Sequence, residues 1–180
     1  MNELITATAE SPPRPGLSEL VERIQPRARQ QAQPVTIAQQ VAEVLTDMDP
    51  SPDLLTEAER AGSPDGYSRH ILYTEAAFSV AGIVWRPGQV TEIHDHLVWC
   101  SFMILQGAET ETLYDVDGDQ VVELGVRQRP AGSVSGVAPP DDIHRVRNTG
   151  DMVAITLHVY GADLSKNGTS VRRTYRSPLQ

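Results

Sequence analysis

The chain of 180 residues has one cysteine, Cys100, and only two phenylalanines and two tryptophans. A single cysteine excludes a disulfide within the chain and is typical of a protein in a reducing compartment. No stretch approaches 18 consecutive apolar residues, which excludes a membrane-spanning helix. The N-terminus lacks the positive start and apolar run of a signal peptide, and we therefore expect a cytoplasmic protein.

Positive charge is also scarce. The chain has 15 Lys and Arg against 24 Asp and Glu, a net charge of −9, and no basic block. This balance provides no surface for phosphate backbones or anionic lipids, so neither nucleic acid nor membrane is expected as a partner. The length allows one domain with a sizeable core and is short for two.

The first part of the sequence predicts a tail followed by helices. Residues 1–16 are rich in Ser, Pro, Ala and Glu and are expected to form a flexible N-terminal tail. Apolar residues at helical spacing predict one helix over 17–31, interrupted near Pro26. They predict a second over 36–48, with Thr36 as its N-cap.

A third short helix is expected between Ser51 and Gly62, which would complete a helical region of residues 17–62. From residue 63 to 180 the pattern changes to short β-rich segments separated by turn residues. Many short strands at this spacing predict an all-β sandwich or barrel, closed as a jelly roll. Hairpins are expected at Asp117-Gly118 and at Thr149-Gly150.

Two histidines, His94 and His96, lie two residues apart in one of these segments. In a strand, side chains at i and i+2 point to the same face about 7 Å apart, so both imidazoles can reach one metal ion. An H-x-H pair alone is equally consistent with two solvent-facing histidines on an edge strand that bind no metal.

The residues around this pair carry a family resemblance. Gly88, His94, His96, Cys100 and Gly107 are spaced as in the first cupin motif, G-x5-H-x-H-x3,4-E-x6-G, with Cys100 where the family has a glutamate ligand. Among cupins, the thiol dioxygenases commonly lack that glutamate, and cysteine there is typical of animal-type cysteine dioxygenase. The resemblance covers about residues 60 to 175 and implies an all-β cupin, a jelly-roll barrel with the N-terminal helices packed outside.

The second half of the metal site resembles the same family. His144 and Asn148 match the H-x3-N ending of the second cupin motif, and the D-I-H-R-V-x-N phrase is similar to bacterial thiol dioxygenases. The resemblance implies that His94, His96 and His144 hold Fe(II), with O2 as co-substrate. Imidazole also suits nickel and other divalent metals. Asp95 should point to the opposite face, which argues against a two-histidine, one-carboxylate site.

The segment from Met152 to Tyr160 has a period of two. Its odd positions from Val153 to Val159 are apolar, and its even positions carry Thr156, His158 and Tyr160. One face therefore packs against another layer, and the other offers hydrogen-bonding groups to solvent or to a site. This row resembles the Ser-x-His-x-Tyr triad of thiol dioxygenases, which implies catalytic roles for these three residues, with His158 orienting Tyr160. The fifth histidine, His70, is taken as structural.

Two segments resemble substrate-binding parts of different thiol dioxygenases. Tyr67 and Arg69 match the Y-x-R-x-L segment of cysteine dioxygenase, in which the arginine binds the substrate carboxylate as a planar fork. Arg173 resembles the carboxylate-binding arginine near the C-terminus of the mercaptopropionate enzymes. The resemblance therefore leaves L-cysteine, 3-mercaptopropionate and mercaptosuccinate open, with L-cysteine as the leading candidate.

Taken together, the resemblance implies a mononuclear non-haem metal dioxygenase that oxidises the sulfur of a small thiol, most simply L-cysteine to its sulfinate. Two alternatives remain open: conversion of cysteine to another oxidised sulfur product, such as a sulfonamide in natural-product biosynthesis, and a non-catalytic metal-binding cupin. Cys100 is either a small residue in the barrel wall or, as the resemblance implies, the partner of Tyr160 in a catalytic thioether. We expect a monomer or a small homo-oligomer.

Overall fold

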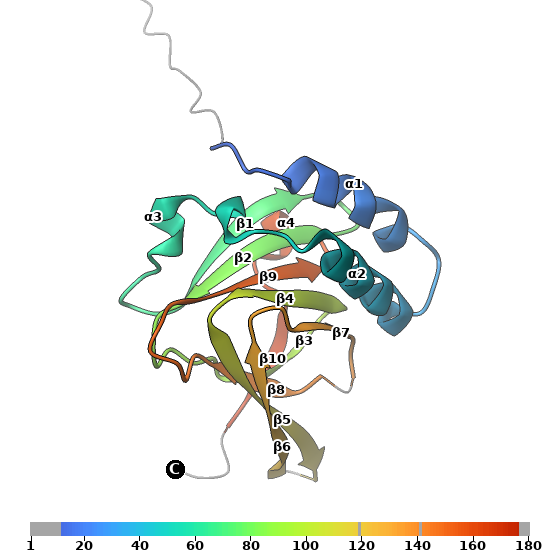
Figure 1. Ribbon diagram of the computed structural model, residues 1–180. Coiled ribbons are helices and arrows are strands. Elements are labelled where there is room, and N and C mark those ends of the chain that lie inside the picture. The colour runs from blue at the N-terminus through green and yellow to red at the C-terminus, as the bar shows by residue number, and fades with distance from the viewer. Residues whose placement is uncertain (1–11, 119, 141, 177–180) are drawn as a thin grey trace, which may run out of the picture.

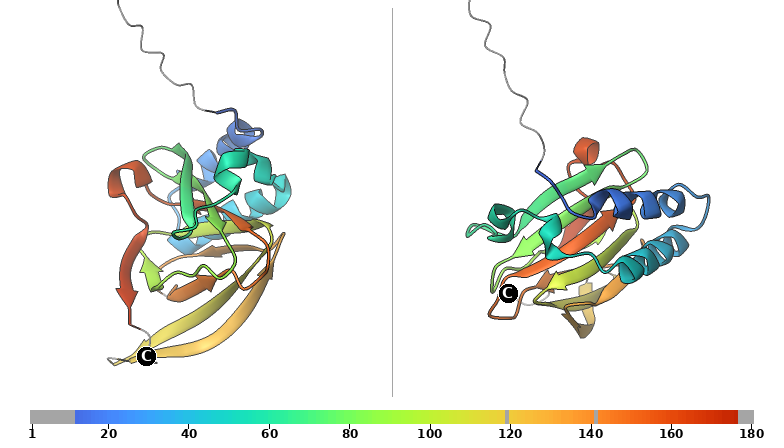
Figure 2. Two further views of the ribbon diagram at one scale, coloured as in Figure 1. Left: turned by 90° about the vertical axis from the view of Figure 1, so that its left-hand side faces the viewer. Right: turned by 45° about the horizontal axis from the view of Figure 1, so that its top comes forward.

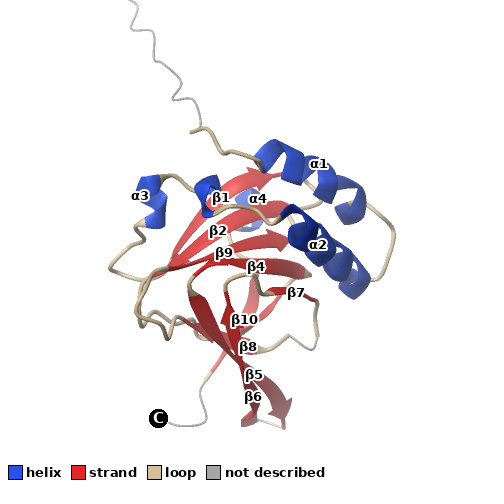
Figure 3. Ribbon diagram, viewed as in Figure 1, coloured by secondary structure: helices blue, strands red, loops and turns tan. Residues whose placement is uncertain are grey.

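The protein is a β-sandwich with helices on one side, seen here in a computed structural model (Figures 1 and 3). The structure describes residues 12–118, 120–140 and 142–176. Among these residues, no helix is both long and apolar enough to cross a membrane. Most of the predicted tail, residues 1–11, lies outside the described residues. The part that is described is tied to the domain, because Arg14 forms an ion pair with Glu59 at 2.8 Å.

Two long helices, α1 (Leu17–Ala28) and α2 (Pro34–Met48), lie on the outside of one sheet. Helix α1 continues through Pro26 and ends two residues later, so the predicted interruption is wrong. Helix α2 begins at Pro34 instead of after Thr36, because proline is well suited to the first helical position, where no N–H partner is needed.

The third predicted helix is two short ones, η1 (Pro52–Leu54) and α3 (Glu57–Arg60). Thr56 separates them because its hydroxyl accepts from the N–H of Glu59, whose carboxylate accepts from the N–H of Thr56. A last short helix, α4 (Leu164–Asn167), precedes the final strand.

In the part of the chain that the structure describes, ten strands form two five-stranded antiparallel sheets that face each other (Figure 2). The first sheet has the order β1 (Ser68–Thr74), β2 (Ser79–Trp85), β9 (Ala154–Tyr160), β4 (Cys100–Gln106), β7 (Val134–Val137). The second has the order β10 (Val171–Tyr175), β3 (Ile93–His96), β8 (His144–Arg147), β5 (Ala108–Asp117), β6 (Gln120–Pro130). This arrangement confirms the predicted jelly roll with helices packed outside.

The order in which the strands are connected differs from the predicted one in two respects. Strands β5 and β6 pair as the predicted hairpin, with Asp117 opposite Gln120. Strands β8 and β9 do not pair, because the chain crosses from the second sheet to the first between them, so the hairpin predicted at Thr149-Gly150 is wrong. Strands β7 and β10 were not predicted, and β10 pairs with the strand that carries His94 and His96.

The main core lies between the first sheet and the helices, which cover the outer face of that sheet in the right-hand view of Figure 2. On β9, Ile155, Leu157 and Val159 are fully buried in a cluster that includes Val41 and Leu45 of α2. The prediction that one face of this strand packs against another layer is therefore confirmed. Because side chains alternate along a strand, Thr156, His158 and Tyr160 point the other way, between the two sheets.

Candidate metal centre

Three histidines meet between the sheets, on the inner face of the second one. His94 and His96 come from β3, and His144 comes from β8, directly opposite His94 in the ladder. One ring nitrogen from each can be chosen so that all three lie within 4.8 Å of one another. All three residues are buried, with at most 8% of their surface exposed.

The outward nitrogen of each ring already has an acceptor. Nδ1 of His94 lies 3.0 Å from the Glu92 carbonyl, Nδ1 of His96 lies 3.0 Å from Asp142 Oδ2, and Nδ1 of His144 lies 2.9 Å from Glu111 Oε1. These contacts favour the tautomer with its proton on Nδ1, leaving the Nε2 lone pairs for a common ligand. The donor set therefore fits a divalent metal ion.

The surroundings of His94 and His96 favour the neutral ring, which is the form that binds metal. Burial, together with the nearby His144 and His96, lowers the pKa of His94 to about 3. Burial also lowers the pKa of His96, against the opposing effect of its hydrogen bond with Asp142. Neither ring has to lose a proton before an ion can bind at neutral pH.

Asp95 lies on the opposite face of β3, as its position between two ligand candidates predicts. Its fully buried carboxylate accepts from Arg172, from Arg173 and from the Tyr175 hydroxyl. Burial opposes ionisation, but the hydrogen bonds from Arg172 and Tyr175 outweigh it and hold the pKa of Asp95 at about 2. Arg173 is therefore engaged outside the sheet and does not line the cavity around the histidines.

Two carboxylates behind the histidines were not singled out from the sequence. Glu111 contacts His144 through Oε1, and its Oε2 accepts from Arg129 at 2.7 and 3.0 Å. Burial would raise the pKa of Glu111, but His144 and Arg129 hold it at about 2. Asp142 accepts from both the backbone N–H and the ring of His96. The alternation of Glu with Thr over residues 109–112 is a sequence signal that could have indicated a face bearing carboxylates, although it does not identify their partners.

We expect Glu111→Gln to weaken divalent-metal binding about 10- to 100-fold, the usual cost of losing a partner behind a metal-binding histidine. The amide still occupies the space but gives His144 a neutral acceptor and removes the charge that pairs with Arg129. Competition with a chelator of known affinity measures the change. Glu109→Gln, which alters a buried glutamate two residues away, is the matched control and should bind metal normally. Equal affinities for the two variants would contradict the role of Glu111.

The wall opposite the histidines is built by β9 and β4. The Tyr160 hydroxyl lies 3.1 Å from His158 Nδ1, and the two rings stack at 5.5 Å. Cys100 is the ladder partner of Tyr160, and its Sγ lies 3.6 Å from the same His158 nitrogen. Burial raises the pKa of Tyr160 and that of the Cys100 thiol, so both keep their protons at neutral pH.

Thr156, the third member of the expected triad, is engaged elsewhere. Its hydroxyl donates to the buried carboxylate of Glu109 on β5. His158 Nε2 is buried and has no hydrogen-bond partner among the described residues. The ring of His158 is instead stacked on Phe102 at 5.5 Å, and the guanidinium of Arg129 lies over Phe102. The structure thus brings His158 and Tyr160 together and directs Thr156 toward Glu109.

Glu109 should make folding stability depend on pH. Burial raises the pKa of Glu109 to about 7, although the hydrogen bond from Thr156 opposes the shift. Because its pKa is higher in the folded than in the unfolded chain, stability is lost as pH rises from about 4.5 to about 7. Between pH 5 and pH 8, Glu109 should cost the wild-type protein about 2–3 kcal/mol of unfolding free energy, and the Glu109→Gln protein should be spared this loss. Urea unfolding at both pH values measures it.

The exposed Glu43 on α2 offers the matched control for this prediction. Glu43→Gln removes the same charge from the surface, and the stability of this variant should depend on pH as that of the wild-type protein does. A Glu109→Gln protein whose stability falls with pH as steeply as the wild type would show that Glu109 is ionised in the folded state at pH 5.

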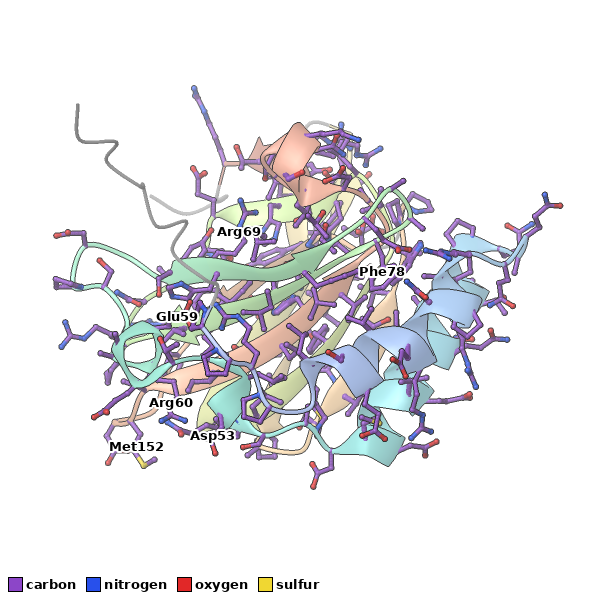
Figure 4. All side chains as sticks on the ribbon, turned by 90° about the horizontal axis from the view of Figure 1, so that it is seen from above. Asp53, Glu59, Arg60, Arg69, Phe78 and Met152 are labelled. Atoms are coloured by element: carbon purple, nitrogen blue, oxygen red, sulfur yellow. The ribbon has the colours of Figure 1, made fainter. Side chains whose placement is uncertain are left out.

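The cavity between the sheets has a volume of about 80 Å³ and reaches solvent beside β1. The three histidines, Cys100, His158 and Tyr160 line its inner part, and Tyr67 and Arg69 line its mouth. The ring of Tyr67 packs against that of Trp85, with the centroids 4.5 Å apart and the planes tilted by 30°. The exposed Arg69 donates to the Gly168 carbonyl at 2.5 Å. Figure 4 shows Arg69 on the side of β1 away from Glu59. His70, which follows Arg69 in the sequence, contacts Ser68 and Glu59 and does not line the cavity.

Similarities to solved structures are distant. An oxalate oxidase in complex with glycolate is 16% identical, with 56% of this chain and 53% of that chain covered and a TM-score of 0.44. A Klebsiella pneumoniae protein with a double-stranded β-helix domain is 17% identical, with 61% and 84% covered and a TM-score of 0.49. A sugar phosphate isomerase of the cupin superfamily from Silicibacter pomeroyi is 23% identical, with 54% and 60% covered and a TM-score of 0.43. This chain thus spans about half the length of the oxalate oxidase.

The match to a protein family is far more extensive. The profile of the family described as cysteine dioxygenase type I matches residues 27–169, which include all three histidines, Arg69 and the whole of β9. The resemblance inferred from the two histidine motifs is thereby confirmed. The chain belongs to the cysteine dioxygenase type I family.

Proposed function

We propose that this protein is a metal-dependent dioxygenase that transfers both atoms of O2 to the sulfur of a small, carboxylate-bearing thiol. L-Cysteine, giving cysteine sulfinate, is the leading substrate. The observation that carries the proposal is the set of three buried histidines on one side of a small cavity with Tyr160 on the other. Membership in the family supports the class of reaction.

His94, His96 and His144 would hold the ion, with Fe(II) first among the candidates. When bound, such an ion favours the thiolate form of a substrate and supplies positions at which thiol and O2 meet. Three protein ligands leave positions open for both reactants. The carboxylates of Glu111 and Asp142 orient two of the rings and strengthen them as donors.

Tyr160 is suited to donate a hydrogen bond inside the cavity. Its raised pKa keeps the phenol protonated, and its ring centroid lies 6.3 Å from that of His96. His158 holds the hydroxyl in place through Nδ1, and burial lowers the pKa of His158 to about 3, so this ring stays neutral. A neutral acceptor can orient the phenol without taking its proton.

Arg69 is the candidate that binds the substrate carboxylate. Its guanidinium lies at the mouth of the cavity, where it now donates to a backbone carbonyl. A carboxylate is a stronger acceptor than a carbonyl, so a substrate entering with its thiol toward the histidines can replace Gly168 as the partner. The engagement of Arg173 with Asp95 on the outer face favours a cysteine-type over a mercaptopropionate-type mode of binding.

The proposal is tested by loading the protein with Fe(II) and following O2 consumption with L-cysteine, 3-mercaptopropionate, mercaptosuccinate and cysteamine. Mass spectrometry of the products should find a gain of two oxygen atoms on sulfur, with L-cysteine turned over fastest. A different oxidised product, such as a sulfonamide, would point to the biosynthetic alternative. A loaded protein that consumes no O2 with any thiol would leave only the non-catalytic metal-binding cupin.

A further expected outcome concerns Cys100 and Tyr160, which are direct ladder partners on β4 and β9. We expect turnover with metal and O2 to join the Cys100 sulfur to the Tyr160 ring in part of the molecules. Tryptic mapping before and after turnover should find a linked pair of peptides that increases with turnover. The Tyr160→Phe protein is the control, because it lacks the phenol that activates the ring. A Cys100 thiol that stays fully alkylatable after many turnovers would contradict the crosslink.

A further inference from the structure

The hydrogen bonds along the inner face of β9 are interrupted between Thr156 and His158. Thr156 donates to Glu109, and the Nδ1 atom of His158 lies 3.1 Å from the Tyr160 hydroxyl. The Nε2 atom of His158 is buried and has no partner among the described residues. The two nitrogens of an imidazole point to opposite sides of the ring, so Nε2 is directed away from Tyr160, toward Thr156 two residues earlier on the same face. A buried nitrogen that lacks a partner thus lies on the side of a hydroxyl that is bonded elsewhere, which is costly.

Glu109, which holds that hydroxyl, is a carboxyl group with little support for a negative charge. It is 3% exposed, and it forms no ion pair within the described part of the chain. The charged groups that face it are Glu111 on its own strand and Arg129, its ladder partner on β6. These two are paired with each other at 2.7 Å, so their effects on Glu109 oppose one another. A buried carboxyl group of this kind is favoured in its neutral form, and burial raises the pKa of Glu109 to about 7.

The proton on Glu109 decides where the Thr156 proton can go. An ionised carboxylate only accepts, so it takes the hydrogen bond of Thr156, and neutral His158 keeps its proton on Nε2 and accepts from Tyr160 at Nδ1. A protonated Glu109 can donate to the Thr156 oxygen, which leaves the Thr156 proton for Nε2 of His158. The ring proton then lies on Nδ1 and is donated to the Tyr160 oxygen, and the phenol proton is left for the cavity.

We propose that Glu109 is a positioning residue for Tyr160: a proton on Glu109 reverses the hydrogen bonds through Thr156 and His158 and directs the Tyr160 hydroxyl proton into the cavity. The change adds one proton, on Glu109. Thr156, His158 and Tyr160 each keep one proton in both states, and only the ring proton changes its atom, from Nε2 to Nδ1. The inference rests on the proposed function, in which Tyr160 donates a hydrogen bond inside the cavity.

The pH dependence of turnover is the first test. If the reaction needs the Tyr160 proton in the cavity, kcat should follow the protonated fraction of Glu109, which for a pKa of about 7 falls about tenfold between pH 6 and pH 8. The Fe(II)-loaded wild type should show this fall with saturating L-cysteine. Glu109→Gln, whose amide can donate to Thr156 at every pH, should keep at pH 8 the rate that it has at pH 6. Steady-state O2 consumption measures both proteins.

Two variants of Thr156 test the connection between Glu109 and His158. Thr156→Val keeps the shape of the side chain but removes the hydroxyl, and it should lower kcat at pH 6 about tenfold or more and abolish the fall toward pH 8. Thr156→Ser should restore both the rate and its pH dependence. Glu43→Gln, which removes an exposed carboxylate from α2, is the matched control and should follow the wild-type profile. A fall in kcat that is equally steep in Glu109→Gln would overturn the inference.

The tautomer of His158 provides a readout that needs neither metal nor turnover. Nitrogen NMR of the metal-free, full-length protein distinguishes a neutral imidazole protonated on Nδ1 from one protonated on Nε2. The wild-type ring should carry its proton on Nδ1 at pH 6 and on Nε2 at pH 8, and in Glu109→Gln it should stay on Nδ1. A wild-type tautomer that does not change, or a change that persists in Glu109→Gln, would overturn the inference. The expected change in a protein that consumes no O2 would support the role of Glu109 and count against the proposed function alone.

Discussion

Replacing His144 with alanine should reduce bound divalent metal from one ion per chain to near background and abolish thiol oxidation. Only His94 and His96 would remain as imidazole donors, and both come from a single short strand. The loss should exceed the 10- to 100-fold expected for the Glu111 variant, because a direct donor is removed instead of its partner. Removal also leaves the Glu111 carboxylate, paired with Arg129, facing an empty space. Elemental analysis after metal loading and desalting measures the change.

His70→Ala provides the control, since it removes a histidine that contacts Ser68 and Glu59 outside the cavity. It should retain one metal ion per chain and full activity. Full metal occupancy in His144→Ala would refute the assignment of the three-histidine site. Full occupancy in that variant together with lost activity would show that His144 serves the reaction in another way.

The candidate ligands could be predicted because their geometry is local. His94 and His96 share a face through the two-residue period of a strand, and the same period separates Asp95 from them. The alternation on β9 likewise divides Leu157, which packs under the helices, from His158, which faces the cavity. The position of His144 in the same site depends on pairing between strands that are distant in the sequence, and only the family motif indicated it.

The carboxylates behind the histidines could not be predicted in this way. Asp142 and Glu111 are charged residues, and charged residues are almost never buried unless they are paired. Their partners come from other strands: His96 on β3 for Asp142, and Arg129 on β6 for Glu111. As long as those pairings are unknown, the sequence alone predicts that both carboxylates lie at the surface.

Errors in the predicted connections have a related cause. A turn such as Thr149-Gly150 indicates that the chain reverses or bends, but not which strand it will pair with next. From β2 to β10, successive strands alternate between the two sheets except at the β5–β6 hairpin, and β8 and β9 follow this alternation. Strand β10 was not predicted because Arg172 and Arg173 interrupt the apolar pattern of a strand, whereas in the structure both pair with the buried Asp95.

The two arginines that the sequence indicated as candidates for substrate binding lie in different parts of the structure. Arg69 lines the cavity, and Arg173 lies on the far face of the second sheet with Asp95 and Tyr175. A carboxylate held by Arg69 leaves the thiol free to extend toward the histidines. For Arg173 to bind the same group, its strand would have to break its contacts with a buried carboxylate. Substrate affinity should therefore depend on Arg69 and hardly on Arg173.

We expect Arg69→Gln to raise the KM for L-cysteine about 30-fold or more while changing that for cysteamine, which lacks the carboxylate, by no more than a few-fold. Losing one partner of a charged, hydrogen-bonded pair costs about 2–5 kcal/mol, and the lower end applies here because Arg69 is exposed when no substrate is bound. Glutamine keeps a donor for the Gly168 carbonyl, so the loop before β10 retains its contact. Steady-state O2 consumption with both thiols measures the ratio.

Arg173→Ala is the matched control, because it removes a guanidinium of the same kind from the outer face of the neighbouring sheet. It should leave the KM for L-cysteine within a few-fold of the wild-type value. Equal effects of Arg69→Gln on cysteine and cysteamine would reject the role of Arg69 in binding the carboxylate. A larger effect of Arg173→Ala than of Arg69→Gln would mean that β10 rearranges when substrate binds, and it would shift the assignment toward the mercaptopropionate enzymes.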